Sequence, residues 1–256
     1  MIHKIIHYCW FGRNALPKSA LRCIESWKKF LPEYEIKEWN EDTFDVNIIP
    51  YTKEAYEAKK YAFVSDYARF WILYHHGGIY FDTDVEVIKP LDDIIAKGPF
   101  MGREAGAYMT TYELPKGLAV APGLALGAEK EMPFYNQVLD AYSGMRFFNI
   151  DGSYNTHTVV EYITRELLKN GLTDDNDNIT KVSDILIYPA DVFCPMDHTK
   201  GNEVTITDRT VSIHLYDCSW MDKNTCGYKM HVLKNKLSKI LGPKLVSGVS
   251  DIIKRR

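Results

Sequence analysis

The stretch from residue 62 to residue 86 reads AFVSDYARFWILYHHGGIYFDTDVE, and its pattern predicts the elements at the centre of the fold. Its first half, as far as Tyr74, is apolar on nearly every side, which predicts a helix buried in the protein interior. Gly77-Gly78 ends that helix, because glycine accepts the positive φ at which a chain leaves a helix. Ile79-Tyr80-Phe81 then predicts a short strand that leads directly into Asp82-Thr83-Asp84.

Asp82 and Asp84 form the centre of the predicted functional site. On a strand, residues i and i+2 point to one face, so both carboxylates can converge while Thr83 points away. Two desolvated carboxylates repel each other and call for a cation beside them, and hard oxygen ligands select Mg²⁺ or Mn²⁺. The alternative is a turn with two solvated aspartates, which the apolar flanks disfavour.

The flanking sequence predicts one α/β domain around this stretch. Residues 2–11, 19–30 and 34–39 predict a strand, a helix and a strand, which is how a βαβ unit begins. A long helical region over 52–76 precedes the two glycines. The remaining expected elements are strands at 85–88, 100–104, 117–127, 185–189 and 211–215, helices at 131–143 and 156–170, and a polar loop at 173–178.

The composition is that of an ordinary soluble protein. The 256 residues are 46% apolar and 25% charged, and the formal net charge of -3 gives no global reason to expect nucleic acid as a partner. The five cysteines form neither a CxxC pair nor a zinc-ligand spacing, which is typical of reduced thiols in a cytosolic protein. With neither a signal-peptide pattern nor an apolar run of about 18 residues, we expect a protein of the cytoplasm or of the inner face of a membrane.

A charged group is expected on the buried helix before the motif. Asp66 and Arg69 are three residues apart and therefore share a helix face, next to Ser65. A charged pair in so apolar a helix is costly unless it meets a partner or a ligand. The simpler alternative is an intrahelical ion pair with no further role.

Four further segments carry candidate groups whose functional interpretation is weak when each is taken alone. His214 follows a predicted strand and could complete a metal shell, and Ser219-Trp220 could donate hydrogen bonds to diphosphate oxygens. Trp10, at the end of the first strand, could stack on a base, although such a residue is more often part of the core. Residues 102–106 could line the acceptor side, and Asn155-Thr156 could reach a sugar or cap a helix.

Together these segments resemble the DxD-containing retaining glycosyltransferases of family 32. The family includes bacterial capsular-polysaccharide transferases and the fungal initiating mannosyltransferase, and the clostridial glucosylating toxins are more distant relatives. The resemblance rests on KIIHYCWFG at residues 4–12, on Trp39-Asn40, on residues 62–86 and on residues 214–220. It covers roughly residues 1–220 and is weaker in the middle of the chain.

The resemblance implies a GT-A fold, which is a Rossmann-like nucleotide-sugar-binding α/β domain with a mixed central sheet and here a C-terminal helical appendage. It assigns the catalytic roles to Asp82, Asp84, Arg69 and Asp66. Asp84 would bind the metal directly, with His214 as a further ligand, and Asp82 would contact ribose and sugar. The remaining donor contacts would be made by Trp10 on the base, Asn40 on the nucleoside, Ser65, Asp66 and Arg69 on the sugar side, and Ser219 and Trp220 on the diphosphate.

The predicted activity is therefore metal-dependent transfer of a hexose from a nucleotide sugar. The resemblance favours a UDP-sugar over a GDP-sugar, a glycan or lipid-linked oligosaccharide as acceptor, retention of anomeric configuration, and a role in capsular or cell-surface polysaccharide synthesis. The alternatives are a metal-dependent phosphatase or nucleotidyltransferase, which gives no role to Arg69 and Trp220, and a nucleotide-sugar-binding protein without turnover, which the intact aspartates disfavour.

The chain is expected to divide into a catalytic domain over 1–228 and a basic tail over 229–256. The tail holds eight basic residues and one acid, and Leu233, Leu237 and Ile240 recur at helical spacing. A basic amphipathic helix predicts contact with anionic lipid at a membrane surface. A C-terminal helix packed on the domain fits the same pattern.

Overall fold

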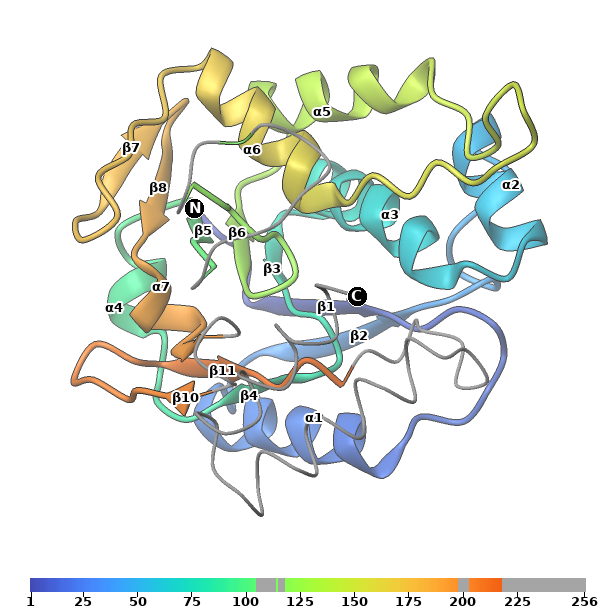
Figure 1. Ribbon diagram of the computed structural model, residues 1–256. Helices are drawn as coiled ribbons and strands as arrows, with labels where there is room; N and C mark the ends of the chain where they lie inside the picture. The colour runs from blue at the N-terminus through green and yellow to red at the C-terminus, as the bar shows by residue number, and fades with distance from the viewer. Residues whose placement is uncertain (105–113, 115–117, 198–202, 218–256) are drawn as a thin grey trace, which may run out of the picture.

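The computed structural model describes residues 1–104, 114, 118–197 and 203–217, and in them a seven-stranded mixed sheet forms the centre of the molecule (Figure 1). The sheet order is β2-β1-β3-β6-β5-β8-β7. β1 is parallel to β2 and β3, β5 is parallel to β8, and the β3–β6, β5–β6 and β7–β8 pairs are antiparallel. The strands are β1 Ile5–Cys9, β2 Glu35–Trp39, β3 Gly78–Tyr80, β5 Phe100–Gly102, β6 Leu126–Ala128, β7 Thr180–Val182 and β8 Ile185–Tyr188. The predicted α/β class with a mixed sheet is confirmed.

Helices cover both faces of this sheet. α3, α5 and α6 lie on one face and α1 lies on the other, and α2 packs against α3 (Figure 1). Alternate residues of β1 divide between the two faces, since Ile6 and Tyr8 join the core under α1 and Cys9 joins the core under α3. The helices are α1 Lys18–Phe30, α2 Pro50–Glu57, α3 Tyr61–His76, α4 Asp92–Ile95, α5 Pro133–Ser143, α6 Val159–Lys169 and α7 Ala190–Phe193.

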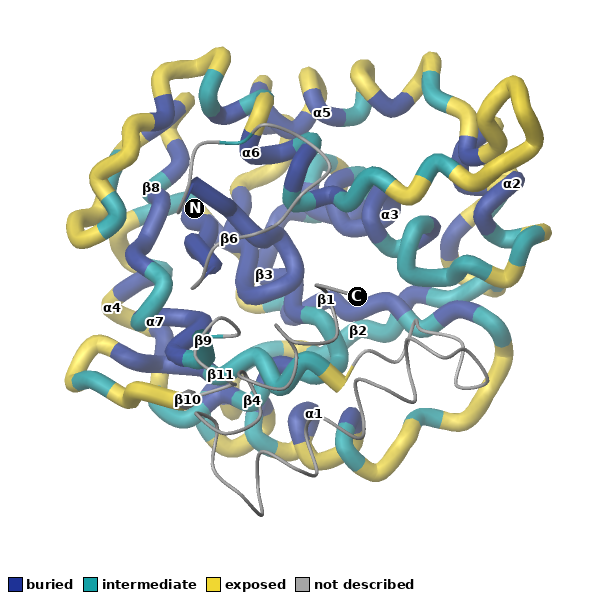
Figure 2. The backbone as a smooth tube through the Cα atoms, viewed as in Figure 1, coloured by how far each residue is buried: buried dark blue, intermediate teal, exposed yellow. Residues whose placement is uncertain are grey.

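Burial follows this layering. α3 and the central strands are buried over most of their length, whereas the outward sides of α1 and α5 are exposed (Figure 2). Val64, Phe70 and Leu73 are fully buried, as expected of a helix that is apolar on nearly every side. This places Arg69, on the same helix, inside the protein.

Two short pairs of strands lie outside the main sheet. β4 (Val85–Val87) pairs antiparallel with β11 (Ser212–His214), and β9 (Met196–Asp197) pairs with β10 (Glu203–Val204). α1 packs on β4, where the Trp27 indole N–H donates to the Val85 carbonyl at 2.8 Å. The β4–β11 pair matters for function because it brings the end of the described chain next to the aspartate motif.

The passage from α3 into β3 requires the two glycines that the sequence singled out. Gly77 and Gly78 have φ of 62° and 102°, and the Gly77 N–H closes the helix on the Leu73 carbonyl at 2.8 Å. A Cβ on Gly78 would lie 2.7 Å from the Ile5 carbonyl oxygen, which is too close for a side chain. Glycine is thus needed both for the turn and for the close approach of β3 to β1.

Two predicted elements are wrong in extent. The helical region over 52–76 is two helices, because the chain turns at Lys59, which has a φ of 58°. The N–H groups of Lys59 and Lys60 bond back to Tyr56 and Ala55, which is the hydrogen-bond pattern that ends a helix at a left-handed residue. The predicted strand over 117–127 is also wrong, since regular pairing begins only at Leu126 and the preceding described residues contain a turn.

No helix among the described residues is long and apolar enough to cross a membrane. The basic tail over 229–256 lies outside the described residues, so its predicted helix and its membrane contact stay predictions.

A buried histidine ties the end of α3 to the first two strands. The His7 ring donates from Nε2 to the Gly77 carbonyl at 2.9 Å, and its Nδ1 accepts the Trp39 indole N–H at 3.0 Å. Because an indole nitrogen only donates, Nδ1 must be unprotonated and the ring neutral. Burial agrees with this assignment, since it lowers the pKa of His7 from 6.5 to about 4.

We predict that neutral His7 makes the stability of the fold depend on pH. The pKa of His7 is lower in the folded protein than in the unfolded chain. Neutral His7 therefore contributes its full share to the free energy of unfolding above pH 6.5, and this contribution is lost as the pH falls toward 4. At the low end of this window the loss amounts to about 3 kcal/mol. His7→Gln keeps a donor for Gly77 but cannot titrate, so its free energy of unfolding in urea should fall less steeply between about pH 7 and pH 4.

His75→Gln is the matched control, because it removes an exposed imidazole at the end of the same helix. Identical slopes for wild type and His7→Gln would show that His7 is not the titrating group.

Candidate functional site

The aspartate motif lies in the turn between β3 and β4. Asp82-Thr83-Asp84 was expected on a strand, and this is wrong, since the Val85 N–H closes a turn on the Asp82 carbonyl at 3.1 Å. The carboxylates converge because the turn folds them together and not because of strand alternation. Thr83, which strand geometry would point away, contributes to the same cleft.

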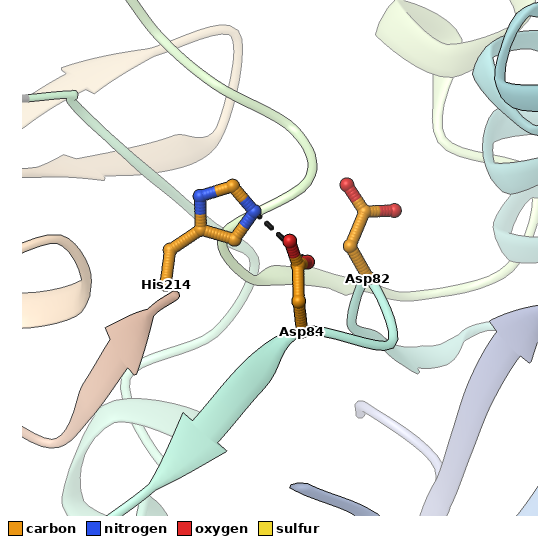
Figure 3. Close-up of side chains that lie close together, drawn as sticks. All are labelled: Asp82, Asp84 and His214. Carbon is orange, nitrogen blue, oxygen red and sulfur yellow. Dashed lines mark ion pairs between the residues drawn. The ribbon is translucent and has the colours of Figure 1, made fainter. Parts of the chain in front are cut away.

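Asp82, Asp84 and His214 form one cluster (Figure 3). Each offers a ligand atom, and the three atoms lie within 4.8 Å of one another. His214 ends β11, directly opposite Val85 in the antiparallel pair with β4, and this pairing places the imidazole beside Asp84. The structure therefore brings together Asp84 and His214, which were predicted to bind the metal, and Asp82, which was predicted to contact ribose and sugar.

Asp84 is held by the segment that follows β11. Its Oδ1 lies 3.0 Å from His214 Nε2, its Oδ2 accepts the Asp217 N–H at 3.0 Å, and its carbonyl accepts the Leu215 N–H at 2.9 Å. Burial alone would lower the pKa of His214, but Asp84 outweighs it and raises that pKa to about 9. Burial likewise opposes ionisation of Asp84, but His214 brings its pKa below the usual 3.8.

The donor set fits a divalent cation. Two ligand atoms bound at about 2.1 Å and at right angles to one octahedral ion lie about 3.0 Å apart, which is the separation of His214 Nε2 and Asp84 Oδ1. Carboxylate oxygens suit Mg²⁺ and Mn²⁺, and an imidazole nitrogen, as the softer donor, favours Mn²⁺ of the two. The imidazole and Asp84 would bind the ion by exchanging their shared proton for it.

Arg69 connects the buried helix to the motif. Its side chain is 4% exposed, its guanidinium lies 2.9 Å from Asp66 Oδ1 and 3.4 Å from Asp82 Oδ1, and it lies over the Tyr80 ring at 5.0 Å. Tyr80 donates its hydroxyl to Asp82 as well, at 3.0 Å. Asp82 is thus held from α3 and from β3 at once.

Asp66 lies behind Arg69 rather than in the cleft. It is buried, and besides Arg69 it accepts the backbone N–H of Val159, at the start of α6. Burial raises the pKa of Asp66 to about 7, although Arg69 lowers it. The intrahelical ion pair considered from the sequence is present, and Arg69 extends it to Asp82.

A cleft of about 270 Å³ joins these groups to the end of β1. Of the predicted site residues it contains Trp10, Ser65, Arg69, Asp82, Asp84 and His214. Asn40 is not among the lining residues, because its amide bonds to Glu38 and to the Asp42 N–H. Ser219 and Trp220 lie outside the described residues, and their assigned contacts stay predictions.

Several cleft residues were not predicted from the sequence. Asn14, Lys59, Tyr61 and Tyr216 line the cleft beside Trp10 and the metal cluster. Gly123 was missed too, although Pro122-Gly123 is a turn signal that argues against a strand there. Its carbonyl accepts the Asp82 N–H at 3.0 Å, and a Cβ at this position would lie 2.0 Å from Asp82 Oδ2.

Residues 17–101 match the profile of a family described as "Glycosyltransferase sugar-binding region containing DXD motif". This range includes α3, the glycine pair and Asp82-Thr83-Asp84. This segment of the chain is the DXD-containing region of a glycosyltransferase. The resemblance drawn from the sequence is confirmed, and the protein is a glycosyltransferase of the DXD family.

Three curated relatives agree with this assignment. The chain is 25% identical over 234 residues to "Uncharacterized glycosyltransferase L373" of Acanthamoeba polyphaga mimivirus, covering 89% of this chain and 78% of that protein. It is 29% and 28% identical to inositol phosphoceramide mannosyltransferases 1 and 3 of Schizosaccharomyces pombe, over 39% and 54% of this chain. The matched parts make up 33% and 36% of those two proteins, so the chain spans about a third of their length.

Solved structures give a more remote likeness. The PaToxG glycosyltransferase is 20% identical, with a TM-score of 0.47 over 66% of this chain and 69% of that chain. A glycosyltransferase involved in the glycosylation of the major capsid of PBCV-1 is 11% identical, with a TM-score of 0.44 over 83% and 93%. At these scores neither structure supports a transfer of site residues or substrates to this chain.

We predict that Gly123→Ala lowers the affinity for Mn²⁺ about tenfold, because its methyl group displaces the Asp82 carboxylate, whose negative charge lies beside the proposed Asp84 and His214 metal ligands. Titration of the purified variant with Mn²⁺ by calorimetry measures this. Gly144→Ala is the matched control, since a Cβ there meets no atom within 4 Å. A folded Gly123→Ala variant with wild-type affinity would contradict the placement of Asp82.

Proposed function

We propose that this glycosyltransferase moves a hexose from a nucleotide sugar, with a UDP-sugar preferred over a GDP-sugar, using Mn²⁺ or Mg²⁺ at Asp84 and His214. The observation that carries the proposal is the convergence of Asp82, Asp84 and His214 in the cleft that also contains Trp10 and Arg69. A phosphatase would need the paired carboxylates but not an aromatic side chain and a buried guanidinium in the same cleft.

The cleft residues on which the proposal rests have separate roles. The Trp10 indole, whose N–H donates to the Asn14 carbonyl at 2.6 Å, offers a face on which the base stacks. A bound divalent ion supplies charge neutralisation for the departing diphosphate. Arg69, held in place by Asp66, keeps Asp82 oriented and adds positive charge beside the sugar.

The transfer is proposed to retain the anomeric configuration without a covalent intermediate. Among the described residues that line the cleft, the carboxylates are Asp82 and Asp84. Asp84 is engaged with His214, and Asp82 is engaged with Arg69 and Tyr80. Since neither is available as a nucleophile, we favour transfer on the face that the diphosphate leaves, within an ion pair.

The acceptor is proposed to be a glycan or a lipid-linked saccharide, in the synthesis of cell-surface polysaccharide. Two of the relatives are named as inositol phosphoceramide mannosyltransferases, which act on a lipid and transfer a hexose. The basic pattern over 229–256 supports an acceptor at a membrane surface.

We predict that a panel of UDP- and GDP-sugars assayed with Mn²⁺ gives nucleotide release from a UDP-sugar and that chelation abolishes it. Asp84→Asn should lower this activity on the order of 100-fold or more, because it removes a charged metal ligand. Glu86→Gln is the matched control, since Glu86 is two residues further along and pairs with Arg22 outside the cleft.

Turnover that is insensitive to chelation, or the absence of turnover with every donor of the panel, would contradict the proposed function.

A further inference from the structure

A buried carboxylate near the metal cluster has no role in the site as described so far. Glu104 follows β5 and is 4% exposed. Its Oε1 accepts the hydroxyl of Tyr216 at 2.5 Å, and the same hydroxyl lies 2.9 Å from Cys194 Sγ. Tyr216 lies in the segment that holds Asp84, and it lines the cleft beside His214.

The backbone of this segment is turned sharply at Tyr216. The N–H groups of Leu215 and Asp217, on either side of it, both donate to Asp84. This is possible because Tyr216 adopts a φ of 51°, a left-handed conformation that costs a non-glycine residue about 1 kcal/mol or more. Such a conformation persists only where contacts of the side chain hold it, and here they come from Glu104 and Cys194.

The His214 ring depends on the same tyrosine. A metal-binding histidine is usually oriented by a hydrogen bond on its second ring nitrogen. Here Nδ1 is buried and has no hydrogen-bond partner among the described residues. The ring instead packs against the edge of the Tyr216 ring, with 4.1 Å between centroids and 71° between planes.

We propose that Glu104 is a positioning residue of the metal site, which acts through the Tyr216 hydroxyl to fix the His214 ring and the two N–H groups that hold Asp84. The inference rests on the metal site of the proposed function. It extends that site to a contact between residues 112 positions apart in the chain. Loss of such an outer contact typically weakens metal binding 10- to 100-fold, and we expect about this loss here.

Three variants test the hydrogen bond between Tyr216 and Glu104 separately from the packing of the two side chains. Tyr216→Phe removes the hydroxyl and keeps the ring that packs on His214. Glu104→Leu removes the acceptor at similar volume, and Glu104→Gln keeps an oxygen that accepts the hydroxyl. Tyr135→Phe is the matched control, because it removes a fully buried hydroxyl from α5, away from the cleft.

The dissociation constant for Mn²⁺ is measured from the electron paramagnetic resonance signal of the free ion. Pulsed spectra of the bound ion report the coupling to the coordinating imidazole nitrogen. We expect Tyr216→Phe and Glu104→Leu to weaken binding about 10- to 100-fold and to reduce the nitrogen coupling, and Glu104→Gln to restore most of both. A variant that is only less stable still binds Mn²⁺ through the same ligand atoms in its folded molecules, and its nitrogen coupling is unchanged. A reduced nitrogen coupling therefore indicates that the His214 ring is no longer positioned on the ion.

The outcomes are distinct. If wild type binds Mn²⁺ with nitrogen coupling and the variants match it in both measurements, Glu104 has no positioning role and the metal site stands. If wild type shows no bound Mn²⁺ or no nitrogen coupling, the metal site is wrong and this inference fails with it. If Glu104→Leu does not fold, Tyr216→Phe decides the question by the same two measurements.

Discussion

Two carboxylates of one short turn are held within reach of each other, and the rest of the site depends on how their repulsion is compensated. Each has its own cationic partner, Arg69 at 3.4 Å from Asp82 and His214 at 3.0 Å from Asp84. The partners come from opposite sides, one from the buried helix α3 and the other from β11. His214 and Asp84 would hold a divalent ion in exchange for their shared proton, whereas Arg69 keeps its charge in every state of the site. In the proposed function Asp84 is accordingly the metal ligand, and Asp82, held by Arg69 and Tyr80, is the carboxylate proposed to face the sugar.

The elements that stabilise the fold also fix the geometry of this turn. α3 carries Arg69, and its end is tied to β1 and β2 by neutral His7 through Gly77 and Trp39. Gly78 lets β3 approach β1, and Gly123 lets the loop before β6 approach the Asp82 carboxylate. Among the described residues that line the cleft, two non-glycine residues have the strain of a positive φ, Lys59 and Tyr216. At Tyr216 that strain is compensated by buried hydrogen bonds, and the same contacts set the position of His214.

The residues that could be predicted are those with a strong local signal. α3, the glycine pair and the aspartate motif are contiguous in the sequence. Their order alone indicates a buried helix, a turn at the glycines where the helix ends, and a strand that ends at the aspartates. The break after α2 was missed because Lys59 occupies the left-handed position where a glycine would have marked a helix end. Gly123 was missed as part of the site because its contact with Asp82 is long-range. Glu104 was considered only within residues 102–106 on the acceptor side, and its long-range contact with Tyr216 was not predicted. Asp66 and Arg69 were expected at the donor sugar, but burial places Asp66 behind Arg69, and no sequence pattern distinguishes those two positions.

The turn after β3 and the end of β11 are together proposed to form a site for a divalent cation. Crystals grown with Mn²⁺ and diffracted at a wavelength where manganese scatters anomalously test it most directly. We expect an anomalous peak at about 2 to 2.5 Å from both Asp84 and His214 Nε2. The absence of a peak there, or a peak bound by other residues, would contradict it.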